Sequence, residues 1–165
     1  MKNKGFSLVE LIVVVAIMGV ALTIGGYALS SISLANAKKC ISEVDAALER
    51  TKMQSFSSDT GTSVAEVSFY RGSDGIYVEK NYEGEAKKIA SSAVTFTYTL
   101  KANPTEIRIL GAEKLTFSFN RSTGAFRDVK LDGTAIGICD KIEISGSGKT
   151  YTMTCYEKTG KIKIE

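Results

Sequence analysis

Hydrophobic and polar positions divide the chain into an apolar N-terminal stretch, an amphipathic stretch and a region of short alternating runs. Residues 11–29 contain no charged side chain. At about 1.5 Å of rise per residue, a helix over this run would be roughly 28 Å long. That length nearly matches the roughly 30 Å of a bilayer's hydrocarbon core. The pattern therefore predicts that residues 6–29 form the membrane-spanning first half of a long helix.

The same helix is predicted to continue, with one apolar face, over residues 30–58. No proline interrupts this stretch, and the polar run 57–61 is typical of a helix end. A helix from Phe6 to about Ser58 would be roughly 80 Å long, which is too long for an ordinary globular helix. The apolar positions that return near one face are Leu29, Ile32, Ile41, Val44, Leu48 and, less regularly, Phe56.

Residues 59–165 carry short apolar alternations separated by turn sequences, which predicts a β-rich globular head. Short strands linked by turns pair antiparallel, and the amphipathic half of the helix would cover their apolar face. The predicted fold class is therefore α+β, a long N-terminal helix packed on a C-terminal antiparallel β-sheet head. The expected strands lie near residues 65–69, 76–78, 94–100, 107–109, 115–119, 129–131, 142–144, 151–155 and 162–164.

Composition excludes several kinds of chemistry. The net charge of +3 is small and its charges are interspersed, which does not indicate a nucleic-acid partner. The absence of histidine removes the usual general base near neutral pH and the commonest transition-metal ligand. No phosphate-binding loop or paired-cysteine motif occurs, and Asp128, Asp132 and Asp140 lack the spacing of a calcium loop. We expect no enzymatic activity, no cofactor and no metal.

The apolar stretch begins with a single carboxylate, Glu10, behind the basic residues Lys2 and Lys4. A charge in the bilayer core costs about 2.5–3.5 kcal/mol on insertion scales, so Glu10 needs a partner. The positive flank predicts that the leader stays cytoplasmic and that the rest of the chain lies outside. A cleaved secretory signal or a plain membrane anchor would leave Glu10 unexplained. The apolar run also exceeds the typical 7–15 residues of a signal core, although residues 35–37 offer a small-residue cleavage site.

The segment around this carboxylate resembles the prepilin cleavage and methylation motif of type IV pilins and related pseudopilins. In this chain the motif reads Lys4-Gly5-Phe6-Ser7-Leu8-Val9-Glu10-Leu11. The resemblance implies a leader of residues 1–5, cleaved between Gly5 and Phe6 by a prepilin peptidase that then N-methylates Phe6. It also implies that Glu10 pairs with the N-terminal amine of a neighbouring subunit.

The implied partners are other pilin subunits, the prepilin peptidase, an inner-membrane assembly platform, and membrane lipid before assembly. The implied location is the cytoplasmic membrane and then an extracellular pilus or a pseudopilus. Many pilins carry a proline about 22 residues into the mature chain, where this chain has Tyr27. Gly19 and the pair Gly25-Gly26 supply weak points in the helix instead.

The C-terminal half also resembles H-type minor pseudopilins and minor pilins, in residues 115–124 and in the closing strand after Thr159-Gly160-Lys161. The resemblance implies a structural subunit of a type IV pilus, more specifically a minor pilin. A pseudopilin of a type II secretion or DNA-uptake system is the alternative. A membrane-tethered extracellular enzyme is a third hypothesis, and it predicts convergent catalytic groups in the head.

The chain has three cysteines, an odd number that is compatible with one bridge or with none. Cys139 and Cys155 flank a predicted hairpin turn at residues 145–148, and an arrangement of this kind resembles the C-terminal disulfide loop of many pilins. A bridge there would contribute about 3 kcal/mol, and two buried thiols are the alternative. Cys40 lies on the predicted helix, where it is either a small packing residue or a disulfide partner.

Overall fold

A computed structural model describes residues 8–57 and 64–165 of the chain, except for the side chains of residues 22–30. One helix, α1 (Leu8–Ser57), accounts for 50 residues. Its end agrees with the predicted end near Ser58, whereas the predicted start at Phe6 lies outside the described residues. The chain divides into two compact units, Met1–Ile32 and Ser33–Glu165. Within the described residues, no helix combines the length and apolarity that a bilayer crossing requires.

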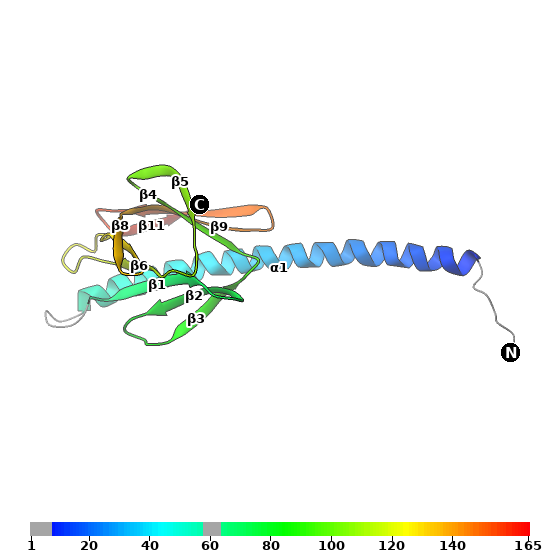
Figure 1. Ribbon diagram of the computed structural model, residues 1–165, viewed down its shortest axis with the longest axis horizontal. Helices are drawn as coiled ribbons and strands as arrows, with labels where there is room; N and C mark the ends of the chain where they lie inside the picture. Colours follow the sequence, from blue (N-terminus) through cyan, green and yellow to red (C-terminus); the bar gives the residue numbers. More distant parts are fainter. Residues whose placement is uncertain (1–7, 58–63) are drawn as a thin grey trace. The chain divides into compact units, whose positions relative to one another are not determined.

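The head contains two antiparallel sheets where the sequence analysis expected one (Figure 1). Sheet A has the strand order β3-β2-β1-β6-β7-β8, and sheet B has the order β11-β10-β9-β4-β5. The predicted α+β class and antiparallel pairing are confirmed. The strands of sheet A are β1 (Glu66–Arg71), β2 (Gly75–Lys80), β3 (Ala86–Ser91), β6 (Leu115–Ser118), β7 (Val129–Leu131) and β8 (Thr134–Gly137). Those of sheet B are β4 (Thr95–Leu100), β5 (Asn103–Ile109), β9 (Cys139–Gly146), β10 (Lys149–Tyr156) and β11 (Lys161–Ile164).

Two strands, β3 and β8, were not predicted. The first three residues of β3, which include two lysines, are exposed, so its sequence shows no apolar alternation. Strand β8 pairs with β7 around a two-residue turn at Asp132 and Gly133, whose φ angles are 46° and 85°. Two consecutive positive φ angles define the type I′ turn that matches the twist of paired strands. The β8 strand therefore forms because of this turn, and not because its own sequence has an apolar alternation.

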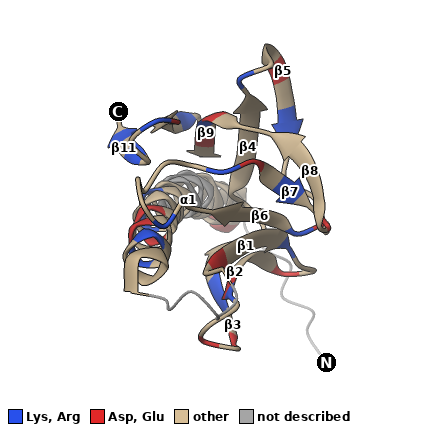
Figure 2. Ribbon diagram, turned by 90° about the vertical axis from the view of Figure 1, so that its left-hand side faces the viewer, with Lys and Arg blue, Asp and Glu red and all other residues tan. Residues whose placement is uncertain are grey.

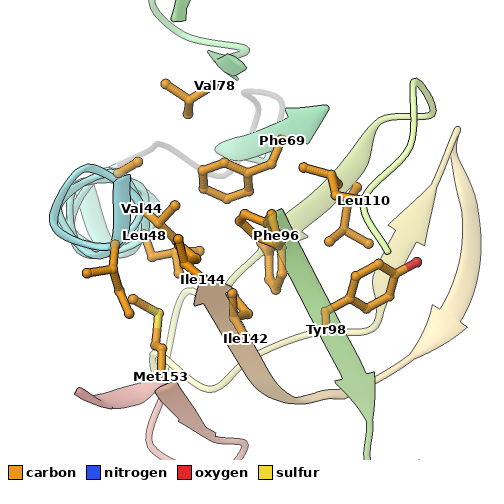
Figure 3. Close-up of a cluster of buried hydrophobic side chains, with 14 of the residues drawn as sticks. Val44, Leu48, Phe69, Val78, Phe96, Tyr98, Leu110, Ile142, Ile144 and Met153 are labelled. Atoms are coloured by element: carbon orange, nitrogen blue, oxygen red, sulfur yellow. The ribbon is translucent and has the colours of Figure 1, made fainter. Parts of the chain in front are cut away.

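The second half of α1 supplies one side of the hydrophobic core. Leu48 and Val44 on the helix lie in the same cluster as Phe69 of sheet A and Phe96 of sheet B (Figure 3). Figure 2 shows the two sheets on two sides of this part of the helix. Fully burying a side chain of this kind stabilises the fold by about 1.5–3 kcal/mol. The helix residues that line the core are Ala37, Cys40, Ile41, Val44, Ala47 and Leu48.

Phe69 on β1 joins the two sheets. Its ring centroid lies 6.0 Å from that of Phe96 on β4 and 5.8 Å from that of Phe117 on β6, the latter in an edge-to-face arrangement. Aromatic pairs in such geometries add about 0.5–1.5 kcal/mol beyond the area that they bury. The ring of Phe69 is fully buried. Sheet A and sheet B therefore share one core.

The buried stripe of α1 is shorter than the periodicity predicted. Ile32 and Phe56, which were placed on the apolar face, are exposed, whereas Ala37 and Ala47 are buried. Ala37 is inside because the β9–β10 hairpin comes very close to the helix at this point. A Cβ atom added at Gly146 would lie only 2.7 Å from the carbonyl oxygen of Ser33 and 2.9 Å from Cβ of Ala37. Close backbone approach, not hydrophobic bulk, decides which helix residues are covered here.

Gly146→Ala is expected to destabilise the head by about 1–3 kcal/mol, because the added methyl group must displace the backbone of α1. Chemical denaturation of the full chain in detergent, followed by circular dichroism, measures the change. Gly111→Ala is the matched control, since a Cβ there meets nothing closer than 4.0 Å. Equal midpoints for the two variants would contradict the close packing.

Candidate functional site

The first turns of α1 carry the residues that the sequence singles out. Glu10 lies in the first turn of the helix, where the helix dipole favours a carboxylate. The predicted cleavage and methylation residues, Gly5 and Phe6, lie outside the described residues. The geometry of the site is therefore that of the segment from Leu8 to Val20, with Glu10 as its acidic member.

This segment is apolar on every side of the helix. Between 44% and 76% of the surface of each large apolar side chain in it is exposed in the isolated chain. A helix that is hydrophobic all round is normally enclosed by lipid or by other protein. The side chains concerned are Leu8, Val9, Leu11, Ile12, Val13, Val14, Val15, Ile17, Met18 and Val20. The segment is thus built to be covered by something other than water, with one carboxylate among its apolar residues.

The fold is α+β, with one long N-terminal helix and two antiparallel sheets. Residues 1–26 match the family described as the prokaryotic N-terminal methylation motif, which confirms the recognition of a type IV pilin or pseudopilin motif. Curated proteins and solved structures gave no match. The match covers 26 of the 165 residues and concerns the N-terminal segment alone. It does not distinguish a minor subunit from other members.

A second candidate site is the pair of thiols at Cys139 on β9 and Cys155 on β10. Both side chains are buried, and both are free thiols in this structure. The hydrogen bond with Cys155 and burial raise the pKa of the Cys139 thiol well above its usual range. Cys139 Sγ also contacts the carbonyl oxygen of Lys141 at 3.6 Å. The structure therefore brings the two residues together, and a disulfide between them stays a prediction.

Cys40, the third cysteine, lies on α1 and not on the strands that carry this pair. It is buried against the core on α1, and burial raises the pKa of its thiol to about 12. A thiol with so high a pKa is protonated at neutral pH and is a poor nucleophile. This agrees with the role of a packing residue.

The sequence analysis missed a groove of about 670 Å³ between α1 and the β2–β3 hairpin. Its walls include the ion pair between Lys87 Nζ and Glu43, at 2.9 Å, and the small residues Ser42 and Ala46. The hydrogen bond from Lys87 lowers the pKa of Glu43. Five basic and three acidic side chains line the groove, so both signs of charge are present. The groove was not predictable because one wall is the unpredicted strand β3.

The three aspartates considered as calcium ligands do not form a cluster. Asp132 instead accepts a hydrogen bond from the backbone N–H of Lys114 at 2.8 Å and holds the β7–β8 turn. Within residues 8–57 and 64–165, no three acidic, cysteine or histidine side chains gather as a metal site would require.

Oxidation tests the predicted pairing of Cys139 with Cys155. Exposure of the purified chain to oxidised glutathione is expected to form an intramolecular bridge that raises the free energy of unfolding by about 3 kcal/mol. Mass spectrometry of the digested protein identifies the linked peptides. Cys155→Ser should abolish the gain and Cys40→Ala should keep it, whereas a gain that survives Cys155→Ser would refute the pairing.

Proposed function

We propose that the protein is a structural subunit of a type IV pilus, and specifically a minor pilin. The observation that carries the proposal is a single carboxylate, Glu10, within an exposed and otherwise apolar helix segment that matches the N-terminal methylation motif. An apolar segment alone would serve as an anchor. The carboxylate adds a charge to these apolar surroundings, where charged side chains usually mark function.

Processing precedes assembly in this proposal. Prepilin peptidase removes the leader, residues 1–5, and methylates the new N-terminus at Phe6. Before assembly, residues 6–29 span the cytoplasmic membrane with the N-terminus on the cytoplasmic side, as the basic leader favours. Residues 30–58 continue the helix into the head, residues 59–165. The assembly platform then transfers the subunit from lipid into the filament core.

The pairing of Glu10 with the N-terminal amine of a neighbouring subunit sets the axial register of assembly. Apolar contacts between helices are not directional and leave many registers similar in energy. Two opposite charges attract strongly in a medium of low dielectric constant, and the attraction is greatest when the two groups are in direct contact. Removing one member leaves the other buried without a partner, which costs about 3–5 kcal/mol. The pair therefore selects one register among many.

A pseudopilin of a type II secretion or DNA-uptake system is the second candidate. The same motif and the same helix support it, and genes for a secretin or for competence proteins beside this one would favour it over pilus genes. A membrane-tethered enzyme has less support, because several charged groups of the described head form surface ion pairs such as Lys114–Glu79 and Lys130–Glu66.

Mass spectrometry of the mature protein tests the processing. We expect an N-terminus at Phe6 that carries one added methyl group, because the peptidase cuts after Gly5. The uncleaved chain, produced in cells that lack the peptidase, is the control. A mature protein that starts at Lys38 would identify a secretory signal and would overturn the proposal.

Glu10→Ala tests the assembly contact. The variant is expected to insert into the membrane normally and to lose incorporation into filaments, at a cost of about 3–5 kcal/mol per contact. Quantitative blotting of membrane and sheared-filament fractions measures both steps. Glu49→Ala, which removes a carboxylate from the second half of the same helix, should incorporate normally. Normal incorporation of Glu10→Ala would refute the charge-pairing role.

A further inference from the structure

Strand β5 is the edge of sheet B, and it exposes the two most accessible isoleucines of the described head. The side chains of Ile107 and Ile109 are 62% and 69% exposed, and they alternate with the half-buried Arg108. Ile109 lies opposite Thr97 on β4, on the threonine face of the sheet that points away from the core. The alternation of this strand therefore places its apolar residues in solvent.

The other three edge strands are protected against pairing with another chain. Lysines on an edge and very short edge strands discourage addition of a further strand. Strand β3 carries Lys87 and Lys88, and β11 carries Lys161 and Lys163 in only four residues. Strand β8 is also four residues long. On β5, by contrast, the segment from Thr105 to Ile109 carries no lysine.

The backbone of this segment has hydrogen-bonding groups that face outward. The N–H of Leu110 donates to the carbonyl of Phe96 at 2.9 Å, which makes these two residues a hydrogen-bonded pair. Hydrogen-bonded and non-hydrogen-bonded pairs alternate along an antiparallel ladder. Ile109, opposite Thr97, therefore directs its N–H and C=O away from β4, and Ile107 lies in the adjoining segment 104–107, which has no partner in the ladder with β4.

The charges of β5 are complementary to those of a second β5 that runs antiparallel. When Ile107 of one copy opposes Ile107 of the other, Glu106 opposes Arg108 twice, once on each side of the two-fold axis. A shift that sets Ile107 opposite Ile109 would oppose two Arg108 side chains, and the reverse shift would oppose two Glu106 side chains. Like charges directly opposite destabilise a strand pair and opposite charges stabilise it. One register is therefore favoured.

The register with Ile107 opposite Ile107 also brings the exposed apolar side chains of the two copies together. Ile107 and Ile109 of both copies would form one apolar cluster on the threonine face, where β-branched pairs pack well. Within one chain, Arg108 Nε already donates to Glu106 at 3.0 Å, and this hydrogen bond lowers the pKa of the Glu106 carboxyl. Both side chains are thus ionised and held at the edge. The register of β5 against β4 is irregular over residues 104–107, and Pro104 has no N–H to donate, so the proposed pairing is limited to residues 105–109.

We propose that the heads of two copies of this protein pair through β5 in an antiparallel arrangement, with the two-fold axis at Ile107. Sheet B then continues from one copy into the other. The contact is isologous, so it closes as a dimer and does not propagate. It uses residues of the head alone and does not depend on the assembly proposed for Glu10.

Cysteine cross-linking tests the register. In a hydrogen-bonded pair the two Cα atoms lie about 5.5 Å apart, inside the range of about 4.4–6.8 Å that a disulfide bridges. The full chain with Ile107→Cys, oxidised in detergent, is therefore expected to form a covalent dimer through residue 107. Ile109→Cys is the matched control, because the two residues at position 109 would be roughly 13 Å apart. Both positions are exposed, so neither change perturbs the core.

Charge reversal tests the recognition in the Ile107→Cys background. Glu106→Arg or Arg108→Glu alone is expected to lower the dimer yield roughly tenfold, because two attractive cross-strand pairs become repulsive. The double exchange of Glu106→Arg with Arg108→Glu should restore the yield. Adding Glu10→Ala should leave the yield unchanged, which separates this contact from filament assembly.

Three results would overturn the proposal. They are the absence of a dimer through residue 107, equal dimer yields for Ile107→Cys and Ile109→Cys, and a yield that charge reversal does not alter. Linkage to one of the native thiols, identified by mass spectrometry, would equally count against it.

Discussion

The fold depends on the need to cover one long helix in two different ways. Over residues 37–48, α1 has a single apolar stripe, and the chain covers it with its own sheets. Over residues 8–20 the helix is apolar on all sides, and its side chains are exposed in the isolated chain. An amphipathic stripe can be satisfied by one domain, whereas an apolar cylinder requires a surrounding medium or other subunits. The head thus covers the second half of α1, whereas the first half is left for a surrounding medium or other subunits to cover.

The head covers the apolar stripe of α1 with two sheets that share one core. A single flat sheet would contact a helix on one side only. Here Phe69 links sheet A to Phe96 of sheet B, and Gly146 lets the β9–β10 hairpin approach the helix backbone. The position of Cys139 beside Cys155 follows from the same hairpin, since β9 and β10 are adjacent strands. The packing of the helix and the placement of the thiols are therefore consequences of one arrangement.

The surface that remains is polar and mixed in charge, and its ion pairs are exposed. Exposed pairs of this kind contribute little to stability, and Figure 2 shows both signs distributed over the strands. Against this background the apolar features of the surface stand out: the first turns of α1 and the edge strand β5. Each combines exposed apolar side chains with a specific charged group, Glu10 in one case and the Glu106–Arg108 pair in the other. In both contacts that we propose, apolar area supplies the drive for association and the charges supply its register.

The sequence alone determined the features that depend on local order. Periodicity of hydrophobic residues predicted α1 and nearly all strands, because a helix repeats every 3.6 residues and a strand every two. The N-terminal motif was readable because processing acts on a linear segment, although residues 1–7 lie outside the described structure. The turn at residues 145–148 was predicted from its glycines for the same reason.

Only the tertiary structure decided which side of each element is covered. Alternation predicted a strand over residues 107–109 but gave no sign that its isoleucines face solvent. Their exposure depends on which face of sheet B the core covers, and that is a property of the tertiary structure. Ala37 became a core residue because the close approach of a hairpin favours a small side chain, whereas the larger Ile32 and Phe56 are exposed. The partition into two sheets depends on pairings between distant strands such as β1 with β6. Local patterns specify elements, and long-range pairing specifies what those elements bury.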